Sequence, residues 1–210
     1  MFNRILCLGA HTDDGEFGCG GTLAKFIGEN KEVYYATFSF AEKSLIKGFT
    51  NDSTHKEILE ATSILGLNKD NLITFNYEVR KFDSYRQDIL EDMVKLNSRL
   101  KPDLVLTHNT QDTHQDHEVI CKESFRAFKQ TSSIFGYESF KNNRRFNSDI
   151  YIELLDKYID IKLKAIQCYK SQIVKKESNT FIIKQAAMVR GANIGCKYAE
   201  CFENIKFIMR

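Results

Sequence analysis

The chain of 210 residues contains no tryptophan, a single proline and no long hydrophobic run. No stretch approaches the roughly 20 apolar residues that a membrane-spanning helix needs, and the first residues turn polar too early for a secretion signal. Neither sign of charge dominates, because 30 basic and 28 acidic residues leave a formal net charge of +2. This near balance gives no indication of a nucleic-acid partner. We therefore expect a protein that neither spans a membrane nor binds nucleic acid.

The six cysteines lack the C-x-x-C pairs that are typical of cysteine zinc sites and redox motifs. We expect all of them to be reduced, as in a cytoplasmic protein. A metal site in this chain would therefore have to be built from histidines and carboxylates.

Short apolar runs alternate with amphipathic stretches, and neither a repeat nor a linker interrupts them. This alternation predicts one α/β domain over residues 1–210, with helices layered on a mostly parallel sheet. We expect strands at 4–9, 32–39, 71–75, 103–108, 133–139 and 149–153, and helices at about 20–29, 54–66, 84–99, 117–128, 155–171 and 181–192.

Histidine and aspartate are concentrated in two segments, each directly after an expected strand. The first, AHTDDGEFGCGG (10–21), follows the strand 4–9, and the second, HNTQDTHQDH (108–117), follows the strand 103–108. Four of the five histidines lie in these two segments. Because ligands bind at the carboxyl ends of strands in open parallel sheets, we expect the two segments to form one site there.

Three residues of these segments form a ligand set typical of catalytic zinc. His11, Asp14 and His117 would supply two imidazoles and a carboxylate and leave a coordination place for water. Zn²⁺ lowers the pKa of bound water from about 15.7 towards 7, and Asp13 would accept the proton. An aspartate pair alone is more often a solvated turn or a helix cap, but the two segments together favour a metal. Zn²⁺ is the expected ion, with another divalent metal such as Fe²⁺ as the alternative.

The glycines of the first segment have a competing interpretation as a phosphate-binding loop. Their spacing fits neither G-x-G-x-x-G nor the pattern that ends in G-K-[ST]. We therefore expect them to serve tight turning and close backbone packing beside the metal site.

With these residues in view, the sequence resembles the PIG-L or LmbE-like family of zinc-dependent N-deacetylases. The family motif A-H-P-D-D-E appears as AHTDDGE, followed by GGTLA, and the motif H-x-D-H appears as HQDH (114–117). YKSQ (169–172) and RGANIGCKYAECF (190–202) resemble the C-terminal segments of the family. The resemblance therefore spans nearly the whole chain.

The resemblance implies a Rossmann-like three-layer sandwich with the active site at the carboxyl ends of the strands. It assigns zinc to the same three ligands and the role of general base to Asp13. It also implies that His114 acts as a protonated imidazole, which stabilises the oxyanion or protonates the leaving amine, and that Asp116 orients His114. The reaction would be attack of metal-activated water on an acetamide carbonyl, with release of acetate and an amine.

The sequence departs from the family in its substrate contacts. Many members carry an arginine at the start of the helix after the second strand, but the segment NDSTHKEILEATSILGL (51–67) has none. Arg190 is the candidate replacement, with a surface salt bridge as the alternative role. Gly15 precedes Glu16, so the role of this glutamate stays open. We expect an N-acetylated amino sugar or conjugate as substrate, with nucleotide-linked or free amino sugars as the leading guess, and a homo-oligomer is compatible with the family.

Two alternative functions stay open at this point. In a metal-dependent phosphoesterase, His108 and Asp112 would complete a site for two metal ions. In a non-catalytic relative, the same pocket would only bind a sugar. Metal stoichiometry distinguishes the first alternative from a deacetylase.

Overall fold

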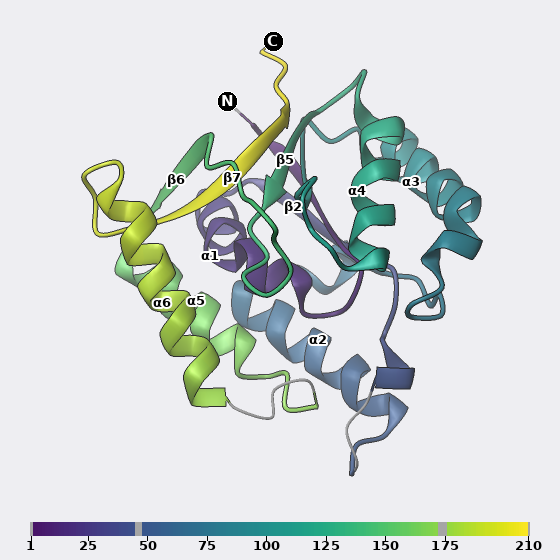
Figure 1. Ribbon diagram of the computed structural model, residues 1–210, viewed down its shortest axis with the longest axis horizontal. Coiled ribbons are helices and arrows are strands. Elements are labelled where there is room, and N and C mark those ends of the chain that lie inside the picture. Colours follow the sequence, from purple (N-terminus) through teal and green to yellow (C-terminus); the bar gives the residue numbers. More distant parts are fainter. Residues whose placement is uncertain (1, 45–47, 172–175, 210) are drawn as a thin grey trace.

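The computed structural model describes residues 2–44, 48–171 and 176–209. In this described part, the strands form one sheet in the order β3-β2-β1-β4-β5-β7-β6 (Figure 1). Five neighbouring strands are parallel, namely β1 (Arg4–Gly9), β2 (Glu32–Thr37), β3 (Leu72–Thr74), β4 (Leu104–His108) and β5 (Ser133–Tyr137). β7 (Tyr198–Lys206) runs antiparallel to both β5 and β6 (Ile150–Leu154).

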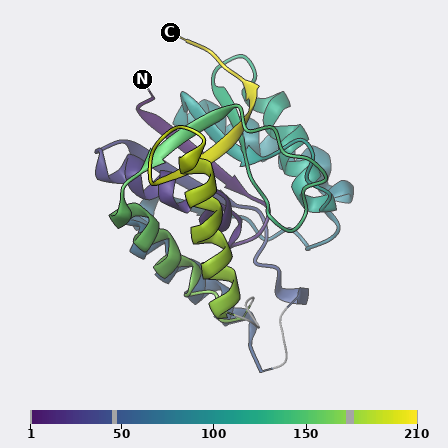
Figure 2. The same ribbon diagram turned by 60° about the vertical axis from the view of Figure 1, so that its left-hand side comes forward.

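Helices cover both faces of the sheet, as Figures 1 and 2 show. One face carries α1 (Asp14–Gly28), α2 (Asn51–Leu65), α5 (Asp156–Ile166) and α6 (Lys176–Ala192), and the other carries α3 (Arg86–Leu100) and α4 (Gln115–Phe128). Each interface between helices and sheet buries its own apolar cluster. Short 3₁₀ turns lie at Glu42–Ser44, Lys69–Asn71 and Phe82–Tyr85. The expected three-layer α/β sandwich with a mostly parallel sheet is confirmed.

β1 lies in the middle of the sheet because its side chains are almost entirely apolar and buried. Ile5 pairs with Val33 of β2 on one side and with Leu104 of β4 on the other. The carboxyl ends of β1 and β4 are therefore neighbours. This register brings the loops that follow the two strands to the same edge of the sheet.

The glycine-rich segment after β1 is helical, whereas we expected a loop up to about residue 20. Close packing explains why glycines are needed there: a Cβ at Gly15 would lie 2.7 Å from the phenol of Tyr35, and one at Gly18 would lie 2.2 Å from the ring of Tyr137. α1 is kinked at Cys19, where φ is −142°. Tertiary packing thus overrides the low helix propensity of glycine.

The strand β7 is absent from the expected elements. Its sequence shows no alternation of polar and apolar residues, because all of Tyr198–Glu203 is buried, Glu200 and Glu203 included. Glu200 accepts hydrogen bonds from the backbone N–H groups of Gly21 (3.1 Å) and Thr22 (2.7 Å), just after the kink of α1. Because these buried carboxylates have specific partners, the strand lacks the alternation of polar and apolar residues by which a strand is recognised in a sequence.

α5 ends at Ile166, earlier than the expected residue 171. The chain then turns inward, and the hydroxyl of Tyr169 donates to the carbonyl oxygen of Thr12 at 2.6 Å. Ser171 binds the carboxylate of Glu57 through its N–H at 2.8 Å and also through its hydroxyl. This segment thus supports the loop that follows β1.

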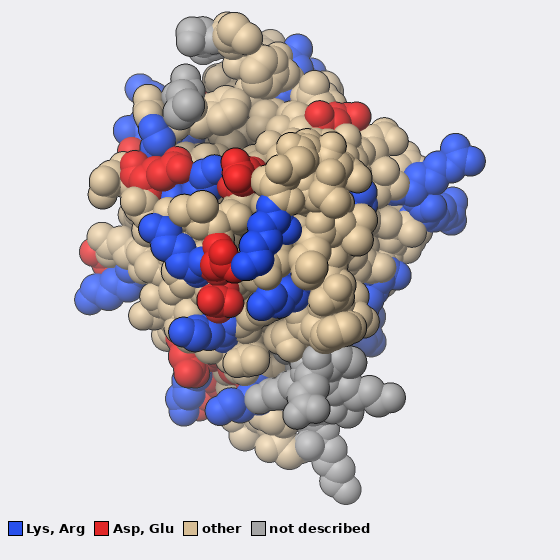
Figure 3. Space-filling model, turned by 90° about the vertical axis from the view of Figure 1, so that its left-hand side faces the viewer, with Lys and Arg blue, Asp and Glu red and all other residues tan. Residues whose placement is uncertain are grey.

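Within the described ranges, no helix combines the length and the apolar character that a membrane crossing requires. All six cysteines lie in the described part, and each is free of a disulfide bond. Figure 3 shows basic and acidic side chains interspersed on one face of the molecule, in keeping with the small net charge.

Candidate active site

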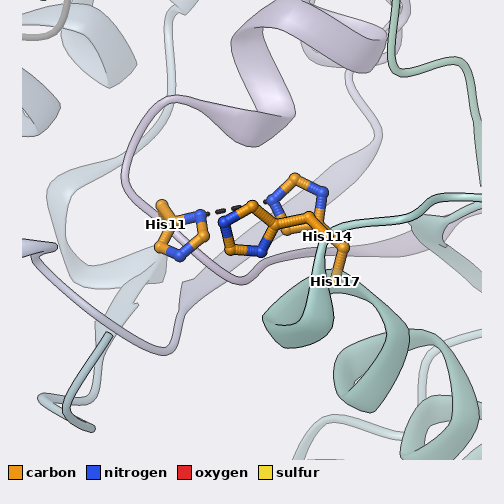
Figure 4. Close-up of side chains that lie close together, drawn as sticks. All are labelled: His11, His114 and His117. Carbon is orange, nitrogen blue, oxygen red and sulfur yellow. Dashed lines mark hydrogen bonds between the residues drawn. The ribbon is translucent and has the colours of Figure 1, made fainter. Parts of the chain in front are cut away.

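The two histidine-containing loops meet at the carboxyl edge of the sheet. Nε2 of His117 lies 3.3 Å from Nδ1 of His11 and 3.4 Å from Oδ1 of Asp14, and Nδ1 of His11 lies 3.5 Å from Oδ2 of Asp14. Figure 4 shows the rings of His11 and His117 facing each other, with His114 beside them. The structure therefore brings together the three residues that the sequence predicts as metal ligands.

This donor set fits a tetrahedral divalent ion. Ligand bonds of about 2.0–2.1 Å to zinc place the donor atoms of a tetrahedral site about 3.4 Å apart. Nε2 of His117 lies at about this distance from Nδ1 of His11 and from Oδ1 of Asp14, and the other oxygen of Asp14, Oδ2, lies 3.5 Å from Nδ1 of His11. Two imidazoles and one carboxylate also leave a fourth position for water.

A carboxylate orients each of the two imidazoles. Nε2 of His11 donates to Asp116 at 3.1 Å, and Nδ1 of His117 donates to Asp112 at 2.9 Å. Each ring therefore turns its other nitrogen, which offers a lone pair to a metal ion when the ring is neutral, towards the centre of the site. Sequence reasoning missed this role of Asp112, since nothing in the spacing of the loop pairs it with His117.

The expectation that the side chain of Asp116 orients His114 is wrong. Its carboxylate binds His11 and accepts the backbone N–H of Arg80 at 2.7 Å, while only its own backbone N–H reaches Nδ1 of His114, at 3.2 Å. His114 is the residue before α4, and this contact is a helix cap. Side chains two residues apart at the start of a helix point in different directions.

His114 is a neutral imidazole here, not the expected imidazolium. Its Nδ1 accepts the cap hydrogen bond from Asp116, so the ring proton lies on Nε2. Burial, together with the neighbouring His117 and His11, lowers the pKa of His114 to about 4. His114 can therefore donate a hydrogen bond into the cavity without carrying a charge.

The adjacent aspartates differ in their electrostatics. Burial alone would raise the pKa of Asp14, but the surrounding imidazoles of His117, His108 and His11 hold it well below its usual range. Burial and the carboxylate of Asp14 raise the pKa of Asp13 to about 6. Asp14 thus stays ionised, as a metal ligand must be, whereas Asp13 has the intermediate basicity that suits a proton acceptor near neutral pH.

The model of the PIG-L family, described as GlcNAc-PI de-N-acetylase, matches residues 6–128, which is more than half of the chain. The chain belongs to the PIG-L family.

One relative of this PIG-L protein is the uncharacterized deacetylase YaiS of Escherichia coli (strain K12), which is 29% identical over 178 residues, or 80% of this chain and 90% of YaiS. The structure of N,N′-diacetylchitobiose deacetylase from Pyrococcus horikoshii superposes with a TM-score of 0.80 at 22% identity, covering 96% of this chain and 83% of that one. GalB, the 4-carboxy-2-hydroxymuconate hydratase of Pseudomonas putida KT2440, has a TM-score of 0.76 at 19% identity, covering 99% and 98%. The fold therefore does not fix the reaction, but the family does: the protein is an N-deacetylase, a hydrolase.

His108 of this PIG-L protein lies behind the donor set. Its Nε2 accepts the backbone N–H of Ala10 at 3.1 Å, and burial lowers its pKa to about 4. The lone pair of the neutral ring is thus used by the protein itself, although the ring lies 3.3 Å from Asp14. With Asp14 and His117, His108 forms a set of three possible donor atoms within 4.8 Å of one another, although its Nε2 already accepts the N–H of Ala10.

Arg190, the candidate replacement for the missing family arginine, forms the alternative salt bridge. Its guanidinium forms two hydrogen bonds with Glu138, of 2.6 and 3.2 Å, and it is absent from the described lining of the main cavity. His55, at the start of α2, stacks on Phe40 and also lies outside that lining. Sequence analysis did not identify Glu138, which lines the cavity, because its partner Arg190 lies 52 residues away.

Proposed function

We propose that this deacetylase removes an N-acetyl group from an amino sugar or a sugar conjugate by zinc-dependent hydrolysis. One observation carries the proposal: three potential metal-binding groups converge, since Nε2 of His117 lies 3.3 Å from Nδ1 of His11 and 3.4 Å from Oδ1 of Asp14, and Nδ1 of His11 lies 3.5 Å from Oδ2 of Asp14. Burial lowers the pKa of His11, but the carboxylates of Asp14 and Asp116 raise it to about 10, so the site stabilises positive charge at this point. A divalent ion supplies this charge.

Two sets of three possible donor atoms lie within 4.8 Å of one another, namely His11 with His114 and His117, and Asp14 with His108 and His117. We favour Asp14 as the third ligand, because a carboxylate offsets part of the charge of a divalent ion and the neutral His114 does not. His11 also fixes Asp14 by donating its backbone N–H to the carboxylate at 2.7 Å. His114 is then left to interact with the substrate.

Bound zinc would lower the pKa of a water molecule to about 7 and polarise the amide carbonyl. Asp13 lines the same cavity and accepts a proton from the attacking water. Nε2–H of His114 donates to the carbonyl oxygen as negative charge develops on it. The proton on Asp13 then passes to the leaving nitrogen, and acetate and a free amine are released.

The alternatives have less support. A two-metal phosphoesterase needs further ligands, but His108 accepts the N–H of Ala10, and Asp112 is bound to His117 and to the backbone N–H of His114 at 2.9 Å. A non-catalytic sugar-binding relative would not need a proton acceptor beside the metal ligands, and Asp13 is present there. We therefore retain a single-metal hydrolase.

We further propose one deacetylase domain over residues 1–210. Its family-matching part, 6–128, supplies the reacting groups, and residues 137–142 and 182–183 line the rest of the cavity. The free cysteines support a cytoplasmic location. A homo-oligomer stays a prediction.

The test combines metal content with acetate release from N-acetylated sugars, with and without a chelator. We expect one zinc ion per chain and activity that the chelator abolishes. Asp13→Asn should retain zinc and lose acetate release by about 10²-fold or more, because it removes the proton acceptor alone. Asp70→Asn, the same change at an exposed residue outside the cavity, is the matched control and should keep the wild-type rate.

Two results would contradict the proposal. Two tightly bound ions per chain would favour the phosphoesterase. Wild-type rates of acetate release by Asp13→Asn would show that another group accepts the proton.

A further inference from the structure

The cavity above the donor set has a lining of two chemical kinds. Its volume is about 350 Å³, and part of its lining is formed by the residues of the proposed reaction. Large apolar side chains also line it, namely Phe17 of α1, Phe140 of the loop after β5, and Ile182 and Ile183 of α6, with the polar Ser139, Lys141 and Asn142 beside Phe140. This volume lies within the roughly 300–1,000 Å³ that drug-sized ligands occupy, so the cavity holds more than an acetamide group.

Two of the apolar side chains at the mouth are open to solvent. Phe140 is 42% exposed and Ile182 is 52% exposed, whereas Ile183 behind them is buried. Large apolar side chains that converge at the entrance of a cavity gain stability when a ligand covers them. The entrance is therefore suited to an apolar part of a ligand.

The charges in the cavity disfavour a phosphorylated ligand. Among the described residues that line it, Lys141 is the only one with a basic side chain other than histidine, and Glu138 is acidic, whereas Asp13 and Asp14 belong to the proposed metal site. Arg190 approaches from outside the lining but is bound in a bidentate pair to Glu138. A diphosphate is usually bound by several arginine, lysine or backbone N–H donors. This composition argues against the nucleotide-linked sugar that the sequence favoured.

We propose that the substrate carries an uncharged apolar substituent, which lies against Phe17, Phe140, Ile182 and Ile183 while the scissile amide lies at the donor set. This inference rests on the proposed deacetylase function. The substituent can be part of the acyl group or lie on the amine side of the amide, and the chemistry of recognition is the same in both cases. The experiment separates these two sources.

The experiment compares kcat/KM within two pairs of substrates. Octyl and methyl N-acetyl-β-glucosaminide differ on the amine side, and N-octanoyl- and N-acetylglucosamine differ in the acyl group. In one of the two pairs, we expect kcat/KM for the eight-carbon compound to exceed that for its short partner by about tenfold or more. The reason is that each buried CH₂ contributes about 0.8 kcal/mol. UDP-N-acetylglucosamine, the charged probe, should be a poor substrate.

Two variants of α6 make the comparison specific. Ile182→Asp should reduce the octyl preference to less than about threefold, because it places a charge on the apolar wall. Val189→Asp makes the same change on the same helix at a residue that is 60% exposed and lies outside the described cavity lining, and it should keep the preference. Equal rates within both pairs, a preference for the UDP-sugar, or an octyl preference that Ile182→Asp retains would each overturn the inference.

A binding measurement separates this inference from the deacetylase proposal. Calorimetry with the zinc-loaded Asp13→Asn variant compares the octyl and short compounds of both pairs without turnover. Preferential octyl binding without hydrolysis of any compound by the wild type would support the apolar subsite and contradict the proposed function alone. No preference in binding, together with hydrolysis of all compounds at equal rates, would contradict the subsite alone.

Discussion

Asp112→Asn tests how the carboxylate behind His117 controls the metal site. The two oxygens of Asp112 each accept a hydrogen bond, Oδ2 from Nδ1 of His117 at 2.9 Å and Oδ1 from the backbone N–H of His114 at 2.9 Å. Asparagine has nearly the same shape but offers one acceptor and one N–H₂ donor. In Asp112→Asn, one of these two N–H groups therefore faces another donor.

The expected cost follows from the burial of Asp112. A buried donor without an acceptor costs about 1–3 kcal/mol, and the ring of His117 can escape this cost by turning or by changing its tautomer. Either change moves the lone pair of Nε2 away from the centre of the site. Loss of such an orienting partner weakens metal binding by about 10–100-fold. We expect a decrease of this size in the zinc affinity of Asp112→Asn.

The assay is a competition for zinc with a chelator of known affinity, together with urea unfolding of the metal-free protein. Asp103→Asn is the matched control, because Asp103 also accepts two hydrogen bonds, from the backbone N–H groups of Asn3 (2.8 Å) and Arg4 (3.1 Å), at the opposite end of the sheet. It should lower the free energy of unfolding and leave zinc affinity unchanged. Unchanged zinc affinity in a folded Asp112→Asn variant would refute the assignment of His117 as an oriented ligand.

Three further changes test other parts of the structure. Zinc at a free concentration of about 100 times its Kd should raise the free energy of unfolding by about 2.7 kcal/mol, and Asp14→Asn should remove most of this gain in a urea titration. Tyr169→Phe removes the hydrogen bond to the carbonyl of Thr12 and should lower the free energy of unfolding by about 1 kcal/mol together with zinc affinity; a variant that loses stability alone would show that Tyr169 does not position the loop. Lys162→Met breaks the buried ion pair with Glu200 and should cost about 3–5 kcal/mol in the same titration, whereas an unchanged transition midpoint would show that the pair adds nothing to stability.

The part of the site that could be predicted from sequence depends on the topology of the sheet. His11 and His117 are 106 residues apart, yet both follow buried strands, and neighbouring parallel strands end at one edge. The prediction for Asp116 failed because closeness in the sequence was taken as evidence of a side-chain contact. Asp116 lies two residues from His114, but its carboxylate binds His11, 105 residues away.

The errors in the fold have a related physical cause. α1 begins at Asp14 although its first residues are rich in glycine. These positions need glycine because Tyr35 and Tyr137 fill the space that side chains would occupy. β7 escaped detection because Glu200 and Glu203 are buried and bound to specific partners. Propensity and periodicity describe a residue and its sequence neighbours, whereas these elements are stabilised by contacts with distant segments.

The proposed reaction and the proposed choice of substrate depend on different parts of this chain. The proposed ligands, proton acceptor and oxyanion donor all lie within residues 6–128, the part that the family model matches. Most of the outer wall of the cavity comes from residues 137–142 and 182–183, beyond that part. Substitutions in these later segments can therefore change the preferred substituent while the donor set, which Asp112 and Asp116 orient, stays intact. A family assignment based on the first part accordingly predicts the chemistry of this protein, and its substrate must be sought through the side chains of the second.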